Sequence, residues 1–245
     1  MPDSDDHRYG FSLPYCDEAL IQQIKAISPE TIVDFGAGAG KIAQITKSAL
    51  QNGYRIIAVE GCRRTAAMLE EAGCYDVVYN GLIHEWLESN TSNYHLAIFG
   101  DVLEHLKPKE IHGVLDKCTA VFDHILINVP LHDLSQTGEM FDNPLEEHKT
   151  YITMHFFDRY RPTEMHIVSG MGYSYVDYGP GWSIMNVHIV CRGLKEQSRI
   201  QASCYWLFHK TLNILQPFGL SRSVSRVVHQ HILPRLSAYG QARKH

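Results

Sequence analysis

Three glycines at alternate positions are the feature that most constrains this chain. They lie in residues 31–41, which read TIVDFGAGAGK. A run of strand-forming residues ends near an acidic residue, Asp34, and Gly36, Gly38 and Gly40 then lead into a helical pattern. Because glycine has no Cβ, such a loop can turn sharply and its backbone can approach a ligand closely. The segment therefore predicts a ligand-binding turn between a strand and a helix.

Two common phosphate-binding patterns do not fit this loop. A P-loop requires Gly-x-x-x-x-Gly-Lys-Ser/Thr, but Phe35 and Ile42 stand at its first and last positions. The dinucleotide fingerprint Gly-x-Gly-x-x-Gly needs a third glycine where this chain has Lys41. The carboxylate of Asp34 also argues against a phosphate in the middle of the loop. The remaining pattern, Asp-x-Gly-x-Gly-x-Gly, favours a nucleoside cofactor, and the alternative is a glycine-rich turn without a ligand.

Two further segments carry acids at the ends of predicted strands. Residues 55–60 (RIIAVE) end at Glu60, about 20 residues beyond the glycine loop, where a carboxylate can accept hydrogen bonds from both ribose hydroxyls. The alternative there is a solvent-exposed acid. Residues 95–106 (HLAIFGDVLEHL) place Asp101 at the end of another strand, with Glu104 and His105 just beyond it.

The order and spacing of these three segments resemble the motifs of class I S-adenosylmethionine-dependent methyltransferases over about residues 30–130. The resemblance implies S-adenosylmethionine as the cofactor. The usual acid after the third strand, which accepts from the adenine amino group, is absent, and the side-chain carbonyl of Asn80 and the backbone N–H of Leu82 are the candidates in its place. The residues that the resemblance assigns to cofactor binding are Asp34, Gly36, Gly38, Gly40, Glu60, Asn80, Leu82 and Asp101.

Alternating strand and helix patterns predict the fold class. The predicted strands are 31–35, 55–60, 75–79, 95–99 and 123–129, and the predicted helices are 17–28, 40–51, 63–72, 82–89 and one from Pro108. Such βα units predict an α/β, doubly wound, Rossmann-like parallel sheet with helices on both faces and ligands at the carboxyl ends of the strands. Strands 173–178 and 183–190, joined by a Gly-Pro-Gly turn, match the antiparallel hairpin that ends the seven-stranded methyltransferase sheet.

The predicted chemistry is methyl transfer to a hydroxyl. A hydroxyl acceptor needs a base, and histidine ionises near neutral pH, which makes His105 and His148 the catalytic candidates. His148 ends residues 143–148 (NPLEEH), and similar strings follow the fifth strand in some bacterial methyltransferases that act on sugars and other hydroxylated small molecules. The expected acceptor is therefore a small molecule or a glycan-like compound, with nitrogen and carboxylate acceptors left open. The structural alternatives are local packing for His105 and an exposed loop position for His148.

Two other functions are alternatives. Asp101, Glu104, His105 and His148 are similar to a carboxylate–His set in small-RNA 3′-end 2′-O-methyltransferases, and a related set occurs in quinone-pathway enzymes, where a divalent cation holds the acceptor hydroxyls. This chain differs in having Asp at the first position, and the prediction assigns no metal. The second alternative is a non-catalytic protein of the methyltransferase fold that binds the cofactor or a partner and works through its C-terminal segment.

Charge divides the chain into two predicted parts. Residues 1–194, the predicted methyltransferase domain, hold fourteen Lys or Arg and twenty-six acids, whereas residues 195–245 hold eight and one. The second part has two apolar helical patterns, so it predicts a helical extension. This extension either packs on the acidic domain or a second subunit, or makes peripheral contact with an anionic membrane. No nucleic-acid motif is visible, so no nucleic-acid partner is expected, and the sequence does not specify the oligomeric state.

Cysteine usage and hydropathy predict a cytoplasmic protein. The six cysteines form no Cys-x-x-Cys pair, and the N-terminus lacks a secretory signal, so reduced thiols are expected. No apolar run approaches the roughly 18 residues of a membrane span. Residues 9–15 (YGFSLPY) are aromatic and either fold over the cofactor as a lid or pack on the domain surface.

Overall fold

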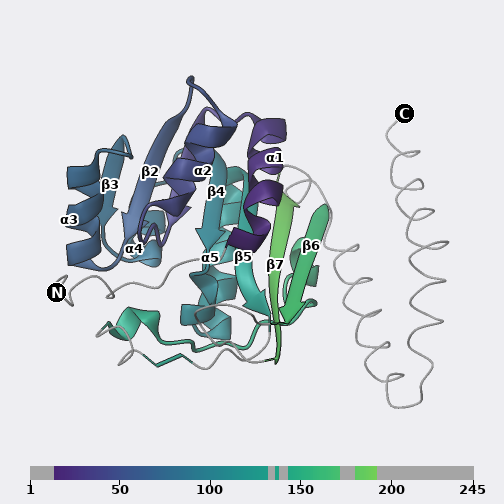
Figure 1. The fold of residues 1–245 in the computed structure, drawn as a ribbon. Coiled ribbons are helices and arrows are strands. Elements are labelled where there is room, and N and C mark those ends of the chain that lie inside the picture. The colour runs from purple at the N-terminus through teal and green to yellow at the C-terminus, as the bar shows by residue number, and fades with distance from the viewer. Residues whose placement is uncertain (1–13, 132–135, 138–142, 172–179, 192–245) are drawn as a thin grey trace, which may run out of the picture. The chain divides into compact units, whose positions relative to one another are not determined.

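A seven-stranded sheet forms the centre of the fold in the computed structural model, which describes residues 14–131, 136–137, 143–171 and 180–191 (Figure 1). The strand order is β3-β2-β1-β4-β5-β7-β6. Strands β1 to β5 are parallel, and β7 is antiparallel to both of its neighbours, β5 and β6. The strands are β1 (Thr31–Phe35), β2 (Arg55–Glu60), β3 (Val77–Asn80), β4 (Tyr94–Gly100), β5 (Phe122–Leu131), β6 (Glu164–Met171) and β7 (Pro180–Val190).

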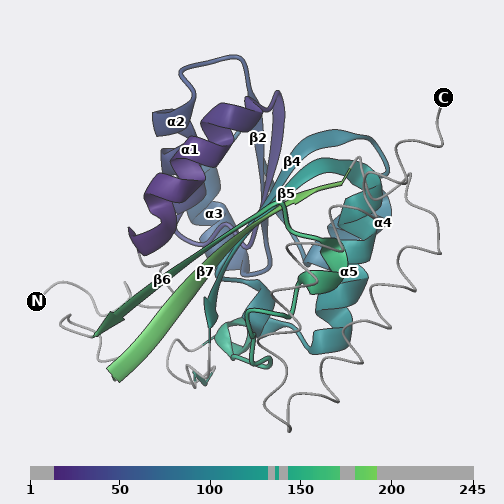
Figure 2. The same ribbon diagram turned by 90° about the vertical axis from the view of Figure 1, so that its right-hand side faces the viewer.

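Helices cover both faces of the sheet (Figure 2). They are α1 (Asp17–Ile27), α2 (Lys41–Ala49), α3 (Arg63–Ala72), α4 (Ile83–Ser89) and α5 (Pro108–Val121). The first three pack on one face and the last two on the other. Successive strand residues supply the two cores in turn: Ile32 belongs to the first, whereas Val33 and Phe35 belong to the second. Burial on both faces explains why the central strands are almost entirely apolar.

The acids predicted at strand ends share one edge of this sheet. Asp34 and Glu60 lie at the carboxyl ends of the neighbouring strands β1 and β2, and Asp101 follows β4 on the other side of β1. In open α/β sheets, the strand order reverses at such a point and leaves a crevice at the carboxyl edge. The predicted α/β fold, with a mostly parallel seven-stranded sheet and an antiparallel terminal hairpin, is therefore confirmed.

One strand of the hairpin differs from the prediction. The sixth strand is Glu164–Met171, which pairs with β7, whereas the sequence pattern predicted residues 173–178. Strand β6 lies at the sheet edge, where Met165 and Ile167 are 36% and 39% exposed. An edge strand does not need a continuous apolar face, so its periodicity gave no signal. Residues 172–179, in which the predicted strand lies, are outside the described residues.

Three other predictions concern segments outside the described residues. They are the aromatic lid before Pro14, the boundary between residues 194 and 195, and the helical extension 195–245 with its proposed membrane contact. These stay predictions. No helix in the described part of the chain has the length and apolar character needed to span a membrane.

Candidate cofactor and acceptor site

The glycine loop joins β1 to α2 in a conformation that side chains rarely adopt. Gly36, Gly38 and Gly40 have φ angles of 72°, 50° and 79°. At Gly36 there is also no room for a side chain, because a Cβ would lie 2.5 Å from Cγ2 of Val102. The Gly36 N–H donates to the carbonyl of Val59 at 2.8 Å, which ties the start of the loop to β2. Glycine is therefore needed here both for the turn and for the close approach to the segment after β4.

The carboxylate of Glu60 connects β2 with this loop. Its Oε2 accepts from the backbone N–H of Gly38 at 2.9 Å, and its Oε1 accepts from that of Cys62 at 2.8 Å. Burial raises the pKa of Glu60, and the backbone N–H donors oppose this shift. The structure thus places a buried carboxylate beside the glycine loop, as the sequence predicts for a ribose-binding acid.

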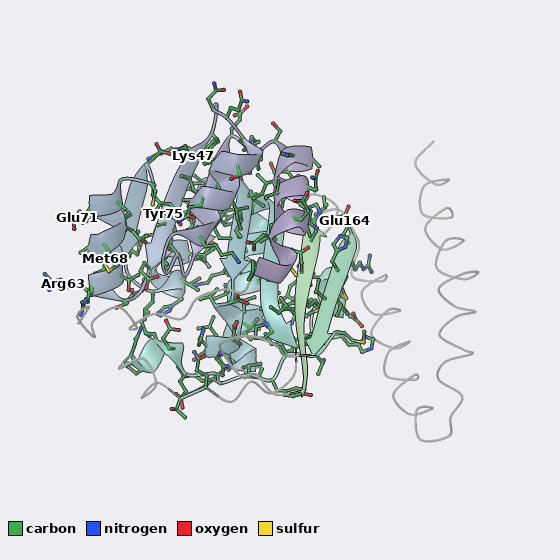
Figure 3. All side chains as sticks on the ribbon, viewed as in Figure 1. Lys47, Arg63, Met68, Glu71, Tyr75 and Glu164 are labelled. Carbon is green, nitrogen blue, oxygen red and sulfur yellow. The ribbon has the colours of Figure 1, made fainter. Side chains whose placement is uncertain are left out.

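Asp34 is a buried acid with one oxygen that lacks a partner. The hydroxyl of Tyr75 donates to Oδ2 at 2.6 Å, while Oδ1 has no hydrogen bond from the described residues. Tyr75, which Figure 3 labels, lies in the segment between α3 and β3, and its hydroxyl reaches Asp34 on β1. Burial raises the pKa of Asp34 to about 7, the hydrogen bond from Tyr75 opposes the shift, and Glu60 adds to it. A ligand with a positive charge or a hydrogen-bond donor would satisfy this oxygen.

The adenine-binding candidates have partners within the protein. The side-chain NH₂ of Asn80 donates to the backbone carbonyl of Glu60 at 3.0 Å. This bond does not use the Asn80 side-chain carbonyl, which is the atom predicted to accept from adenine. The N–H of Leu82 donates to Oε2 of Glu85 at 2.8 Å, so it serves the start of α4 in this structure. Both assignments stay predictions.

Asp101 turns the chain directly after β4. It has a φ of 49°, in the left-handed region that residues other than glycine seldom occupy, and its N–H donates to the carbonyl of Asn128 at 2.8 Å. Such backbone conformations cluster at functional sites. The turn leads into η2 (Leu103–His105), a short 3-10 helix that carries Glu104 and His105.

Residues 143–150, which follow β5 by twelve positions, are held against η2. The N–H groups of Lys149 and Thr150 both donate to the carbonyl of Glu104, at 2.8 and 3.0 Å, and the Thr150 hydroxyl donates to the carbonyl of Leu106. These bonds bring His148 to His105, with ring centroids 4.9 Å apart. The structure therefore unites the two predicted catalytic histidines, which are far apart in sequence.

The environment of this pair favours a neutral His105 and disfavours a charged carboxylate at Glu104. Burial, with a smaller contribution from the neighbouring His148, lowers the pKa of His105 to about 4, while the backbone carbonyls of Glu147 and Asp101 oppose the shift. Burial raises the pKa of Glu104 well above its usual range, and the charges of Asp101 and Glu146 add to this. At neutral pH His105 is unprotonated, so a ring nitrogen has a lone pair available for a proton or a cation.

Sequence reasoning missed three polar residues near this edge. Tyr75, the partner of Asp34, stands at the start of the predicted strand 75–79, where nothing in the sequence distinguishes it from a packing residue. Asn128 and Asn186 face each other in register on β5 and β7, and both are buried with side-chain atoms that have no partner among the described residues. Two amides inside otherwise apolar strands were the available signal, because buried polar groups normally need partners.

Comparisons with known proteins support the fold. No protein-family model and no curated protein sequence matches the chain. Among solved structures, TehB from Haemophilus influenzae is 14% identical, with a TM-score of 0.53 over 71% of this chain and 61% of that one. The N-terminal domain of EvdMO1 with S-adenosylhomocysteine bound is 13% identical, with a TM-score of 0.50 over 73% of this chain and 82% of that one. A S-adenosylmethionine-dependent methyltransferase from Archaeoglobus fulgidus is 15% identical, with a TM-score of 0.47 over 70% and 94%.

The sheet order decides the assignment. This chain has the fold of class I methyltransferases. The residues present also fit the cofactor of that fold: one oxygen of Asp34 has no partner among the described residues, the glycine loop carries no side chain larger than that of alanine between residues 36 and 40, and Glu60 presents a carboxylate beside it. The role of each residue in binding remains a proposal, because similarity at this level of identity concerns the fold alone.

Proposed function

We propose that the protein transfers a methyl group from S-adenosylmethionine to a hydroxyl of a small-molecule or glycan-like acceptor. The single observation that carries the proposal is the arrangement at the carboxyl edge of the sheet. There, a glycine loop with two buried carboxylates adjoins the turn that leads to a pair of neighbouring histidines. The first group suits a nucleoside with a positively charged tail, and the second suits a hydroxyl that must lose a proton.

The cofactor half of the site, which consists of the glycine loop, Asp34 and Glu60, binds and orients the cofactor. Asp34 can receive the positively charged amino group of the methionine part, which would satisfy the oxygen that has no partner among the described residues and would offset the buried charge. Glu60 can exchange its bond with the Gly38 N–H for bonds with the ribose hydroxyls. S-adenosylmethionine supplies a methyl group activated by a sulfonium, so the protein has to align the acceptor and needs no electrophile of its own.

The acceptor half of the site, which consists of Glu104, His105 and His148, activates the hydroxyl. His105 is neutral at physiological pH because of its burial, and it contacts His148. An unprotonated imidazole in this position can accept the hydroxyl proton as the oxygen forms its bond to the methyl group. The cofactor product is the neutral thioether S-adenosylhomocysteine, because the electron pair of the broken S–C bond remains on sulfur. The lone pair of the same imidazole can also bind a cation, which is a second way to activate the hydroxyl.

One similar structure supports the proposed cofactor. The EvdMO1 domain was solved with S-adenosylhomocysteine, which is the product of the proposed reaction. A non-catalytic protein of the same fold remains the alternative of a different class. Binding of S-adenosylhomocysteine without methyl transfer to any acceptor in a broad panel would favour that alternative.

Titration calorimetry with S-adenosylhomocysteine tests the proposal. We expect micromolar binding by the full-length protein and a loss of at least about 100-fold in Glu60→Ala, because both ribose contacts would go. Glu71→Ala is the matched control, because Glu71 lies on the outer side of α3, away from the sheet (Figure 3). No binding by a folded protein, or an equal loss in both variants, would contradict the proposed cofactor.

A further inference from the structure

We propose that Glu104, His105 and His148 form a binding site for one first-row divalent metal ion. Each of these residues offers one ligand atom, and the three atoms lie within 4.8 Å of one another. Within the described residues, this is the one group of metal-ligating side chains that comes together in this way. The site deepens the proposed function, on which its role in the reaction rests, because it specifies how the acceptor hydroxyl is held and activated.

The donor types decide the class of metal. Two imidazole nitrogens and one carboxylate oxygen suit Mn²⁺, Fe²⁺, Co²⁺ or Zn²⁺, whereas Mg²⁺ and Ca²⁺ prefer oxygen ligands throughout. Metal–ligand bonds of about 2.0–2.2 Å would bring the donors to about 3.0–3.4 Å from one another. From the present separations of up to 4.8 Å, the donors have to approach one another by at most about 2 Å to reach that geometry.

The backbone holds the three ligands in place before any metal arrives. Glu104 and His105 are neighbours in η2, and the bonds of Lys149 and Thr150 to the Glu104 carbonyl fix the segment that carries His148. Nδ1 of His105 lies 3.2 Å from the carbonyl of Glu147. When Nδ1 donates its proton there, the other ring nitrogen keeps its lone pair for a metal, and such second-shell bonds orient histidine ligands in many metal sites.

Charge and burial at Glu104 point to a cationic ligand. The side chain is only 2% exposed, and its Oε2 accepts no hydrogen bond from the described residues. A buried carboxylate with such an oxygen is costly unless a cation compensates for it. A divalent ion that the two neighbouring histidines also bind would supply the missing partner.

Three protein ligands leave coordination positions open for the acceptor. A hydroxyl bound there loses its proton more easily, because the metal stabilises the alkoxide. In this form the histidines act as ligands rather than as proton acceptors, and the proton passes to water. The metal-dependent and metal-independent routes of the proposed function can therefore be separated by measurement.

Cobalt binding tests the proposal. The untagged full-length protein is first stripped of metal with a chelator, and Co²⁺ binding is then followed by visible absorption and by calorimetry. We expect one Co²⁺ per chain. Binding should weaken at least about 10-fold in His148→Asn and in Glu104→Gln, because each removes one of three ligands. The control is His84→Asn, a change of the same type at an exposed histidine of α4, which should bind Co²⁺ as the parent protein does. Mg²⁺ should compete poorly.

The outcomes distinguish this proposal from the proposed function. A folded protein that binds S-adenosylhomocysteine but no Co²⁺ overturns the metal site and leaves the cofactor assignment intact. Co²⁺ binding that His148→Asn does not weaken, or that His84→Asn weakens equally, also overturns it. Binding at these residues without any binding of S-adenosylhomocysteine supports the metal site and contradicts the proposed function. If Glu104→Gln does not fold, the partly buried His148 decides the question alone.

Discussion

The buried carboxylates in the two halves of the site differ in how the protein surrounds them. In the cofactor half, Asp34 receives a short hydrogen bond from Tyr75, and the neighbouring Glu60 receives two from backbone N–H groups. In the acceptor half, Glu104 has one oxygen with no partner among the described residues, lies near other acids, and belongs to the histidine cluster. Asp34 and Glu104 both have raised pKa values, but the cofactor half satisfies more of its carboxylate oxygens from within.

This difference indicates different demands on the two halves. In the cofactor half, backbone N–H groups and the Tyr75 hydroxyl satisfy three of the four carboxylate oxygens of Asp34 and Glu60, and among the described residues only Oδ1 of Asp34 is left for a ligand. In the acceptor half, Oε2 of the single carboxylate Glu104 has no partner among the described residues, and proteins tolerate such an atom mainly where a ligand or ion completes the arrangement. We therefore expect mutations in the first half to affect cofactor binding and folding, and mutations in the second to affect transfer and metal binding.

The largest expected effect comes from Gly36→Ala, because Gly36 belongs to the cofactor half and touches the acceptor half. The new Cβ would lie 2.5 Å from Cγ2 of Val102, and the alanine would have to keep a φ of 72°. We expect a loss of about 2–5 kcal/mol in the free energy of unfolding, which combines backbone strain with overpacking. Binding of S-adenosylhomocysteine should fall with it.

Gly53→Ala separates the two causes of that loss. Gly53 has a φ of 83°, but a Cβ there would meet nothing within 4 Å. Chemical denaturation should show a loss of about 1–2 kcal/mol, from strain alone. Equal losses in the two variants would mean that the close approach of Gly36 to Val102 does not contribute to the free energy of unfolding. The two halves would then be less tightly packed together than the structure indicates.

The two halves also differ in how far the sequence predicted them. Asp34 and Glu60 lie at the carboxyl ends of their strands, and the three glycines follow the first of these strands directly, so local spacing was sufficient to place them at one edge. The contact between His105 and His148 depends on the backbone bonds from residues 149 and 150 to Glu104, across more than forty residues of chain. No local pattern encodes that contact, and only the resemblance to a known family suggested both residues.

Edges and buried polar pairs were harder still. The sheet order followed from alternating βα units, whereas the position of β6 did not, because an edge strand with exposed Met165 and Ile167 has little apolar periodicity. Tyr75 reaches Asp34 only after β1 and the segment before β3 come together. Such features arise from tertiary packing, which local propensity does not report.

Asp34→Asn tests the buried charge of the cofactor half through its pH dependence. The pKa of Asp34 is raised to about 7 from its usual value of 3.8, so the unfolded chain releases its proton first as the pH rises. The contribution of Asp34 to stability is therefore complete below about pH 4 and is lost as the pH rises towards 7. Relative to the parent, the cofactor-free variant should gain about 2–4 kcal/mol between pH 4 and pH 8.

Urea denaturation of both proteins at several pH values measures this difference. Because Glu60 and Glu104 also have raised pKa values, the parent curve alone cannot identify Asp34, and the difference between the two curves is the relevant quantity. Curves that stay parallel from pH 4 to pH 8 would contradict the assignment.

His105→Asn should affect the acceptor half alone. We expect methyl transfer in single-turnover assays to slow by about 100-fold, because the variant removes either the base or a metal ligand. The dissociation constant of S-adenosylhomocysteine should change less than about 2-fold, since His105 makes no contact with the glycine loop among the contacts described. His84→Asn should change neither quantity. A large loss of cofactor affinity in His105→Asn would contradict the assignment of His105 to the acceptor half alone.

The smallest effect is expected from Leu145→Ala, at the point where residues 143–150 contact the cofactor half. Leu145 belongs to residues 143–150, yet a Cβ on Gly61 would lie 2.9 Å from its Cδ1 and 3.2 Å from Cδ2 of Leu82. Both leucines therefore cover the end of β2, beside the predicted adenine position, and both are 39% exposed. Leu145→Ala should weaken binding of S-adenosylhomocysteine by about 5-fold, or about 1 kcal/mol, because it uncovers that apolar surface.

Met68→Ala is the matched control for Leu145→Ala. Met68 is 40% exposed and lies on the outer side of α3, so truncation there removes a similar apolar surface without touching the site (Figure 3). Both variants should unfold at nearly the same urea concentration as the parent, while only Leu145→Ala changes the calorimetric affinity. If the affinities of the two agree, Leu145 merely packs on Gly61. If only Leu145→Ala binds S-adenosylhomocysteine more weakly, the cofactor stabilises the observed position of residues 143–150, which also carry His148. The Leu145 side chain would then couple the cofactor half to the acceptor half.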